Sequence, residues 1–408
     1  MAQSGTRVRD GGNPDDDARS ESAVSPDPLD RTDGSRRADD PTIVDLMTNN
    51  RLRGMSITID HGLRCETIAK ALRTIAPDWT LRESDPLAGG YHHVHRLVVD
   101  TPAGERECVL KATPDDERSD GVEPRLLSVL AERTSLPVPG VLGVVDDHGT
   151  VPSPYFVMDA AAGRVVDRTE ADRLSTPTLG TISRSVGRHL ADLHCLDAVN
   201  EFGHVTHRTG PLDGNRPPGT IDSIGVADPT PSWPPLVREW TDDWLDRLAE
   251  SRFADLVPEV RPVVDRKCND LTEAGPFDSA ICHIDCSLDN LAFDLEDGSV
   301  TGLLDWEFTL AAPPAYDLAF VEGSLAGGPW WYVPDASDRR MAIGDALHEG
   351  YRDGGSGEVP REGRDFYELA TCLSSMTLFE DWLVSIGATD EQIEGAARRH
   401  HQRMWTLL

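Results

Sequence analysis

Four polar residues in the segment 281–307 are of the types that phosphoryl transfer requires: His283, Asp285, Asn290 and Asp305. This reaction uses a carboxylate beside the acceptor hydroxyl and oxygen ligands for Mg²⁺, of which one or two are carboxylates. In this interpretation Asp285 is the base, and Asn290 and Asp305 hold the metal. The alternative is a hairpin with solvated acidic residues, because the chain contains 71 Asp and Glu residues.

Two apolar runs, 291–294 and 300–304, separate these polar residues. Between the runs lies Glu296-Asp297-Gly298-Ser299, and Asp-Gly between two apolar runs indicates a β-hairpin. The polar groups then lie at the open end of the hairpin, where they can converge. The spacing H-x-D-x(4)-N, followed by an apolar strand and Asp, is the catalytic-loop and metal-binding pattern of the protein-kinase-like fold.

The composition of the chain excludes several partners and compartments. The net charge of −32 repels nucleic acid and anionic membranes, so neither is expected as a partner. Lysine occurs only at Lys70, Lys111 and Lys267, and this acidic, lysine-poor composition resembles that of cytoplasmic proteins from extreme halophiles. The chain has no apolar run long enough for a transmembrane helix and no apolar signal core at its N-terminus, so we predict a cytoplasmic location.

The seven cysteines favour a reducing compartment, because they are odd in number and contain no C-x-x-C pair. Cys282, His283 and Cys286 lie close in sequence, but no second Cys/His pair of zinc-finger spacing accompanies them. We therefore expect no zinc site. The His92-His93-x-His95 cluster predicts no metal either, since strand alternation points His92 away from the other two.

The N-terminal 48 residues are predicted to be a disordered acidic tail. Up to about residue 40 they are mostly Asp, Ser, Arg, Gly and Pro, which cannot bury enough apolar surface to offset the entropy of ordering. We expect an N-lobe over 49–160 and a helical C-lobe over 161–408.

The expected N-lobe contains a possible nucleotide site. Gly89 and Gly90 form a turn in which backbone N–H groups can approach a phosphate closely, although an ordinary turn would use the same residues. Lys111 lies in the apolar run 107–112, and a buried lysine needs a partner to keep its charge. Glu123, which opens the helical pattern 123–134, is the candidate. The alternative is a surface lysine and a helix-start glutamate stabilised by the helix dipole.

The remaining pattern is mainly helical. Residues 141–146 and 155–158 read as strands, and Met158, Asp159 and Ala160 begin the link between the lobes. The segment 203–235 is rich in Gly, Pro and Asp and is predicted to be a long loop. Amphipathic or apolar patterns predict helices over 63–75, 179–193, 236–248, 255–274, 313–320, 339–352, 364–386 and 390–408.

Taken in order, these features resemble the aminoglycoside phosphotransferase family of small-molecule kinases, a branch of the protein-kinase-like fold. The resemblance extends from about residue 87 to 320. It includes LLDWEFTLAAPPAYDLAF after Asp305, TSLPVPGVLGV, YFVMDAAAG and VGRHLADLHCLD. It implies an α+β, two-lobe fold with a small antiparallel β N-lobe and a mostly helical C-lobe.

The resemblance also implies roles for individual residues. ATP would lie under the Gly89-Gly90 hairpin, with its adenine against the backbone of 158–160. Lys111 would hold the phosphates, braced by Glu123, and Asp285 would orient or deprotonate the hydroxyl of a small-molecule acceptor. Asn290 and Asp305 would bind Mg²⁺, and Glu307 lies near enough to join them or to position the substrate.

The chain departs from the family pattern around the catalytic loop. Ile284 stands where the family usually has Gly, Cys286-Ser287 replaces the usual residues after Asp285, and Pro313-Pro314 replaces Asp-Pro. These changes leave the catalytic groups in place but put the acceptor site in doubt. The competing hypothesis is a catalytically silent, nucleotide-binding pseudokinase with a regulatory role, and the presence of Lys111, Asp285, Asn290 and Asp305 together argues against it.

Overall fold

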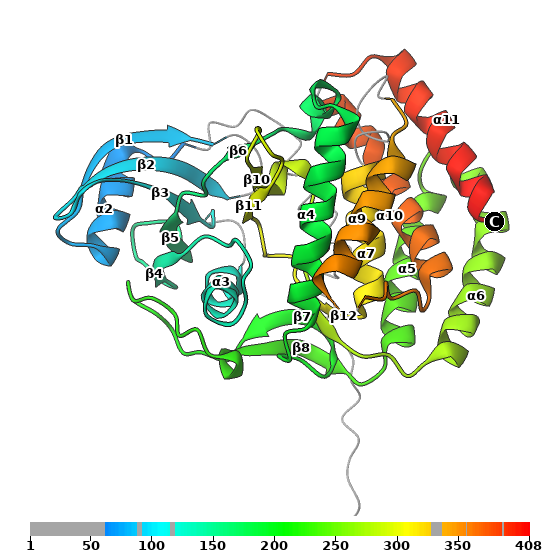
Figure 1. Ribbon diagram of the computed structural model, residues 1–408, viewed down its shortest axis with the longest axis horizontal. Helices are drawn as coiled ribbons and strands as arrows, with labels where there is room; N and C mark the ends of the chain where they lie inside the picture. Colours follow the sequence, from blue (N-terminus) through cyan, green and yellow to red (C-terminus); the bar gives the residue numbers. More distant parts are fainter. Residues whose placement is uncertain (1–61, 88–91, 115–118, 328–336, 356, 386) are drawn as a thin grey trace, which may run out of the picture. The chain divides into compact units, whose positions relative to one another are not determined.

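The computed structural model describes residues 62–87, 92–114, 119–327, 337–355, 357–385 and 387–408 (Figure 1). The tail predicted over 1–48 and the predicted phosphate-binding Gly89 and Gly90 lie outside the described residues. The predicted lobe boundaries at 48 and 160 remain predictions. We use "N-lobe" for the elements from α2 to β5 and "C-lobe" for those from β6 to α11.

The N-lobe is built on one antiparallel sheet of five strands. The strand order is β1-β2-β3-β5-β4, with bounds Thr80–Pro86, His93–Thr101, Gly104–Ala112, Tyr155–Asp159 and Val141–Val145. Alternating side chains of β5 serve two cores: Tyr155 and Val157 pack with α2 (Cys65–Ile75), whereas Phe156 packs in the core that contains α3 (Val122–Arg133). The two helices therefore lie on opposite faces of the sheet.

Two small sheets follow in the C-lobe. The predicted hairpin forms from β10 (Leu291–Phe293) and β11 (Val300–Leu303), and β6 (Arg164–Val165) pairs with its outer edge. The second sheet has the order β8-β7-β12-β9, with β12 at Leu310–Ala312 and β9 at Ala280–Cys282. Strand β9 leads directly into the catalytic loop that begins at His283.

The prediction of a long loop over 203–235 is wrong in part. This segment contains most of β7 (Phe202–His207) and all of β8 (Ile224–Thr230), which pair antiparallel, and the first three residues of α5 (Trp233–Ala249). Its glycines and prolines obscured the strand pattern, and the second partner of β7, strand β12, lies about a hundred residues away and is not visible in a local window.

The predicted helices of the C-lobe are all present. They are α4 (Thr176–His194), α5, α6 (Val257–Ala274), α7 (Pro314–Glu322), α9 (Arg340–Gly354), α10 (Arg364–Ser385) and α11 (Asp390–Leu407). Helices α4 and α9 cross closely, because a Cβ on Gly187 would meet the carbonyl oxygen of Leu347 at 2.1 Å. In the described residues, each helix is too short or too polar to span a bilayer.

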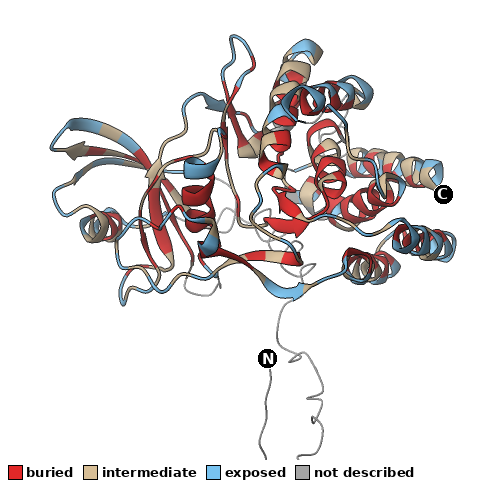
Figure 2. Cartoon of the chain, turned by 60° about the horizontal axis from the view of Figure 1, so that its bottom comes forward, coloured by how far each residue is buried: buried red, intermediate tan, exposed pale blue. Residues whose placement is uncertain are grey.

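The buried residues line the faces that these helices turn toward one another and toward the sheets (Figure 2). One core is formed by α5, α6, α7, α10 and α11. A second joins α3, α4, α9 and the catalytic hairpin. The two-lobe α+β fold predicted from the sequence is confirmed.

Candidate active site

The buried ion pair predicted between a strand lysine and a helix glutamate is present. Lys111 lies near the end of β3 and Glu123 in the first turn of α3, and both side chains are buried. Lys111 Nζ donates to Glu123 Oε2 at 2.7 Å. The second oxygen, Glu123 Oε1, accepts from the backbone N–H of Trp306 at 3.3 Å, which ties α3 to the segment after β11.

Lys111 also meets two carboxylates from the C-lobe. Its Nζ lies 2.8 Å from Asp305 Oδ1 and 3.6 Å from Glu307 Oε2. Burial alone would lower the pKa of Lys111, but Asp305, Glu123 and Glu307 together raise it well above its ordinary value. The ammonium group therefore stays charged and joins β3, α3 and the end of the hairpin.

The two C-lobe carboxylates differ in their proton affinity. Burial raises the pKa of Asp305 to about 7, despite the opposing effect of Lys111. Burial also acts to raise the pKa of Glu307, but Lys111 and His92 outweigh it and lower that pKa to about 2. Glu307 is accordingly the more firmly ionised of the two.

His92 was not predicted to belong to this cluster. It lies just before β2, and its Nε2 contacts Glu307 Oε2. The two residues are 215 apart in sequence, so no local pattern could join them. The contact links the segment after the predicted glycine turn to the C-lobe carboxylates.

The catalytic loop places Asp285 and Asn290 at the same end of the hairpin as Asp305. The side-chain amide of Asn290 donates to the carbonyl oxygen of Asp285 at 3.0 Å. The N–H of Leu304 donates to the Asn290 carbonyl oxygen at 2.9 Å, so Asn290 lies beside the residue that precedes Asp305. The convergence predicted from the hairpin is thus seen in the backbone bonds.

His283 supports the loop and lies away from solvent. Burial lowers its pKa, so the ring is neutral. Its Nε2 donates to the carbonyl oxygen of Leu304 at 3.1 Å, and its ring packs against the buried indole of Trp306 at 4.3 Å between centroids. These contacts let His283 brace the loop against Leu304 and Trp306.

A buried carboxylate that the sequence did not single out holds this loop. Asp317, on α7, is fully buried and accepts from the backbone N–H groups of His283 at 3.1 Å and Ile284 at 2.7 Å. His194 Nε2 lies 2.9 Å from the same carboxylate, and His194 Nδ1 lies 3.0 Å from the Tyr351 hydroxyl. Asp317 thus connects α4, α7 and α9 to the residue that precedes Asp285.

The backbone at Ile284 explains why glycine is usual at this position. Its φ is +71°, in the left-handed region that costs an ordinary side chain roughly 1–2 kcal/mol. The two hydrogen bonds that His283 N–H and Ile284 N–H donate to Asp317, and the burial of the Ile284 side chain, which is 1% exposed, hold the residue there. Asp305 adopts a similar conformation, with φ of +62°.

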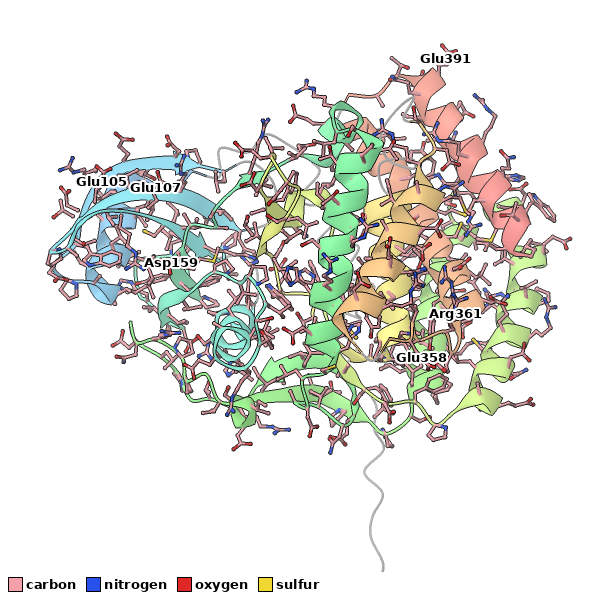
Figure 3. All side chains as sticks on the ribbon, viewed as in Figure 1. Glu105, Glu107, Asp159, Glu358, Arg361 and Glu391 are labelled. Carbon is pink, nitrogen blue, oxygen red and sulfur yellow. The ribbon has the colours of Figure 1, made fainter. Side chains whose placement is uncertain are left out.

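The residues predicted to face the adenine base lie where β5 ends. Met158, Asp159 and Ala160 are all half-buried. Asp159, labelled in Figure 3, pairs through its side chain with Arg106, and its N–H donates to the Gly140 carbonyl oxygen at 2.8 Å. The amide of Asp159 is therefore engaged by the sheet, and a base would have to use the neighbouring backbone groups.

The carboxylates at the end of the hairpin suit a hard cation. Ligand oxygens of Glu123, Asp305 and Glu307 lie within 4.8 Å of one another. Carboxylate oxygens are the ligands that Mg²⁺ prefers, and Asp305 and Glu307 are each half-buried and face one another across Lys111. These donors fit the magnesium ion that the fold implies.

A second group of possible ligands, His194, Cys282 and Asp317, has a different explanation. The imidazole and the carboxylate already bond to each other, and Cys282 Sγ donates to the Ala312 carbonyl oxygen at 3.3 Å. Burial raises the pKa values of the Cys282 and Cys286 thiols well above normal, which keeps both protonated and poor as metal ligands.

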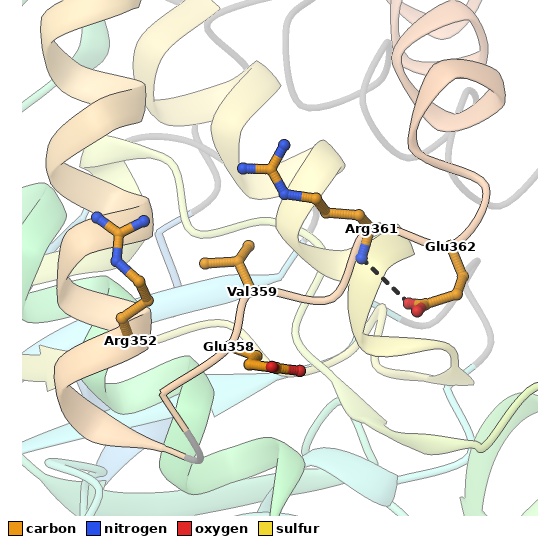
Figure 4. Close-up of a pocket in the computed structure, with 5 residues that line it drawn as sticks. All are labelled: Arg352, Glu358, Val359, Arg361 and Glu362. Carbon is orange, nitrogen blue, oxygen red and sulfur yellow. Dashed lines mark hydrogen bonds between the residues drawn. The ribbon is translucent and has the colours of Figure 1, made fainter.

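A surface pocket of about 370 Å³ lies apart from this cluster, at the connection between α9 and α10 (Figure 4). It is lined by Arg352, Glu358, Val359, Arg361 and Glu362. None of the residues around Lys111 or Asp285 contributes to it.

Comparison with protein families decides the assignment. Residues 85–365 match the model of the phosphotransferase enzyme family. The chain belongs to this family. The match begins at β1 and includes Lys111, Glu123, the catalytic loop and the hairpin, so the chain is a small-molecule kinase by family.

Solved structures similar to this phosphotransferase confirm the fold. A predicted aminoglycoside phosphotransferase from Ralstonia eutropha JMP134 superposes with a TM-score of 0.55 at 17% identity, over 84% of this chain and 96% of that one. The GDP complex of wild-type aminoglycoside 2′-phosphotransferase-IIIa superposes with a TM-score of 0.51 at 10% identity, over 85% and 100%. The GDP and kanamycin complex of APH(2″)-IIIa gives 0.50 at 10% identity, over 83% and 98%.

One curated relative shares only part of its length. A protein of Arabidopsis thaliana named Probable acyl-CoA dehydrogenase IBR3 is 24% identical over 198 residues. The match covers 48% of this chain and 22% of that protein, so the phosphotransferase spans about a fifth of its length. The dehydrogenase in its name is said of that whole protein and not of this chain.

Proposed function

We propose that this phosphotransferase moves the γ-phosphate of ATP to a hydroxyl group of a small molecule, such as an aminoglycoside-like compound, an amino alcohol, a sugar or another metabolite. The observation that carries the proposal is the position of Lys111. Its ammonium lies between Glu123 and Asp305, at the hairpin end that also holds the Asp285 loop. A cation fixed by an α3 carboxylate beside a metal-ligand carboxylate suits the phosphates of a nucleotide.

In this proposal the protein positions two substrates and moves one proton. Lys111 binds the nucleotide phosphates and is kept charged by Glu123. Asp285 accepts the proton of the acceptor hydroxyl while the hydroxyl oxygen bonds to the γ-phosphorus. The bond from that phosphorus to the β-phosphate oxygen breaks, and ADP leaves. His283 and Asp317 keep the Asp285 backbone in place.

Asp305 and Asn290 would hold Mg²⁺, and Glu307, beside Asp305, would either add a further oxygen ligand or position the substrate. When bound, the ion neutralises phosphate charge during transfer. Nothing here favours the pseudokinase alternative, because the residues that the proposal needs are retained: Lys111 contacts Asp305, and Asn290 contacts the backbone of Asp285. The charge of −32 disfavours nucleic acid as a substrate.

Two variants test the chemistry because they should fail differently. Asp285→Asn keeps the shape but removes the proton acceptor, so it should abolish transfer and leave Mg·nucleotide binding nearly intact. Asp305→Asn should weaken magnesium-dependent nucleotide binding itself. We would titrate both with Mg·ATP, and with Mg·GTP because similar structures hold GDP, and assay transfer to a panel of hydroxyl compounds in high salt. Full transfer by Asp285→Asn would refute the mechanism.

A further inference from the structure

The helix that carries Glu123 packs against both lobes. Every residue of α3 from Val122 to Leu130 is buried. Its apolar side chains share one core with α4, α9 and the catalytic hairpin, whereas α2 and the opposite face of the N-lobe sheet form a separate core. The orientation of α3, and with it that of Glu123, therefore depends on contacts with the C-lobe as well as with the N-lobe sheet.

The first turn of α3 is fixed by a fully buried arginine. Arg125 is 0% exposed and uses all three guanidinium nitrogens. Its Nη1 donates to the carbonyl oxygen of Gly121 at 2.8 Å, and its Nη2 donates to Asp146 Oδ2 at 2.7 Å. Its Nε donates to Thr209 Oγ1 at 2.7 Å. A buried arginine with these partners joins the start of α3, the end of β4 and the C-lobe.

Thr209 belongs to a C-lobe segment, residues 206–215, that reaches the N-lobe; we call it the clamp segment. It pairs with the edge strand β4 through three backbone bonds: Asp146 N to Leu212 O at 3.0 Å, Val144 N to Asn215 O at 3.1 Å, and Gly214 N to Val144 O at 2.8 Å. The clamp segment thus extends the N-lobe sheet by an antiparallel bridge at Val145 and Asp213.

The clamp segment also grips the residues that lead into α3. Thr206 Oγ1 donates to Asp120 Oδ2 at 3.0 Å, and His207 Nε2 lies 2.7 Å from the Asp120 carbonyl oxygen. The other oxygen, Asp120 Oδ1, accepts from the N–H of Val122 at 3.0 Å and so caps the helix. The next residue, Gly121, has φ of +68°, and a Cβ there would lie 3.0 Å from Arg125 Nη1.

We infer that Arg125 is a positioning residue for the nucleotide site. With Asp146 and Thr209 it fixes the first turn of α3, so that Glu123, two residues earlier, is held on Lys111 before a nucleotide arrives. The inference rests on the proposed function, because it treats the Lys111–Glu123 pair as part of the phosphate site. It assigns the clamp segment a role in nucleotide affinity, although that segment contains none of the residues around Lys111.

Weakening the contacts that hold α3 should raise the KM for nucleotide far more than it lowers kcat. If α3 samples positions in which Glu123 leaves Lys111, only a fraction of molecules is ready to bind nucleotide. The apparent dissociation constant rises by the inverse of that fraction, so a competent fraction of about one tenth gives about a tenfold rise. Saturating nucleotide selects the competent form, and kcat then stays close to that of the parent.

Thr209→Val is the sharpest test, since Arg125→Met removes a buried charge beside Asp146 and is at risk of not folding. The valine keeps the size of the side chain but leaves Arg125 Nε without its acceptor. Thr209→Ser restores the hydroxyl and is the rescue variant. Thr241→Val is the matched control, because Thr241 is buried in α5 and, among the described residues, its hydroxyl donates only to Val237 O in its own helix, at 2.7 Å.

We would measure Mg·ATP affinity by calorimetry, the KM for ATP and kcat by phosphate-transfer assay, and amide hydrogen exchange over α3 and α4. Thr209→Val should raise the dissociation constant and KM about five- to tenfold with kcat within about twofold. It should also speed exchange in α3 more than in α4, whereas a general loss of stability speeds both. Thr209→Ser and Thr241→Val should keep the parent's KM.

Unchanged affinity and unchanged α3 exchange in Thr209→Val would overturn the inference, as would a lowered kcat at unchanged KM. A parent protein that binds neither ATP nor GTP would instead overturn the proposed function. In that case the α3 exchange of Thr209→Val still decides whether the clamp segment fixes the helix, so the two failures are distinguishable.

Discussion

Asp317 is the residue whose replacement should most clearly separate the shape of the catalytic loop from its chemistry. Its carboxylate touches no predicted substrate or metal ligand directly, yet it accepts from His283 N, Ile284 N and His194 Nε2 within 2.7–3.1 Å. Asp317 itself is 0% exposed. Asp317→Asn changes the charge and one acceptor atom with almost no change in volume.

The size of the effect follows from these bonds. An asparagine has one carbonyl oxygen, and its amide group would face a backbone N–H, so at least one of the three bonds is lost and one donor is left facing another. A hydrogen bond to a charged group contributes about 1.5–3 kcal/mol, and a buried unpaired donor costs about 1–3 kcal/mol. We therefore expect the free energy of unfolding to fall by about 2–5 kcal/mol.

The loop should also relax. Ile284 is held at a φ of +71°, which costs roughly 1–2 kcal/mol, and the bond from its N–H to Asp317 opposes that cost. When the bond is weakened, the backbone can leave the left-handed region and move the next residue, Asp285. A displacement of about 1 Å at a reacting group reduces turnover by about a hundredfold.

The assay pairs denaturant unfolding with transfer kinetics, and Tyr351→Phe serves as the graded control. Tyr351 contacts His194 and lies one bond further from the loop, so its loss of a hydroxyl should cost about 1 kcal/mol and leave turnover within a few-fold. Nucleotide affinity should be close to the parent's in both variants, because Lys111 is untouched. If Asp317→Asn unfolded and turned over like the parent, the loop would not depend on this carboxylate.

Two further predictions concern charge. Lys111→Met leaves the carboxylates of Glu123, Asp305 and Glu307 without their cation. The variant should lower phosphoryl transfer at limiting nucleotide by about a hundredfold or more. Its melting temperature should rise more steeply with MgCl₂ concentration than the parent's, and an equal magnesium dependence would contradict this. Burial lowers the pKa of His400 to about 4, so between pH of about 6.5 and 4 the unfolded chain binds a proton that the folded chain does not, and stability falls by up to about 3 kcal/mol as pH drops through this window. His400→Phe should flatten that part of the unfolding profile, and an unchanged profile would rule out the buried neutral histidine.

Local patterns predicted the helices, several strands and the Lys111–Glu123 pair, although they missed β7 and β8. Alternation and helical periodicity are set by which face of an element is buried, and this is why β3, α3 and the C-lobe helices could be predicted from sequence. The Lys111–Glu123 pair could be predicted from sequence as well, because a charge inside an apolar strand needs a partner, and the next helix supplies one twelve residues later.

The residues that sequence reasoning missed act over long separations. Asp317 lies more than thirty residues from His283, and the clamp segment lies more than eighty from Arg125. Nothing in a window around Arg125 marks it as fully buried, because its partners come from β4 and from a segment rich in Gly and Pro that was predicted to be a loop. Such contacts are set by how the elements pack, and one chain without its fold does not show them.

The presence of a lysine at position 111 can be argued from geometry. Lysine is rare in this chain, which uses arginine for nearly all of its basic residues. Lys111 Nζ nevertheless contacts carboxylates on α3 and on both sides of Trp306, at 2.7, 2.8 and 3.6 Å. A compact ammonium can donate in three directions from one atom, whereas a guanidinium is a planar fork suited to one or two carboxylates in its own plane. Its longer fork would also push apart β3 and the hairpin end, where side chains are buried. Lysine is therefore favoured over arginine at position 111, because its charge must contact three carboxylates that converge from different directions.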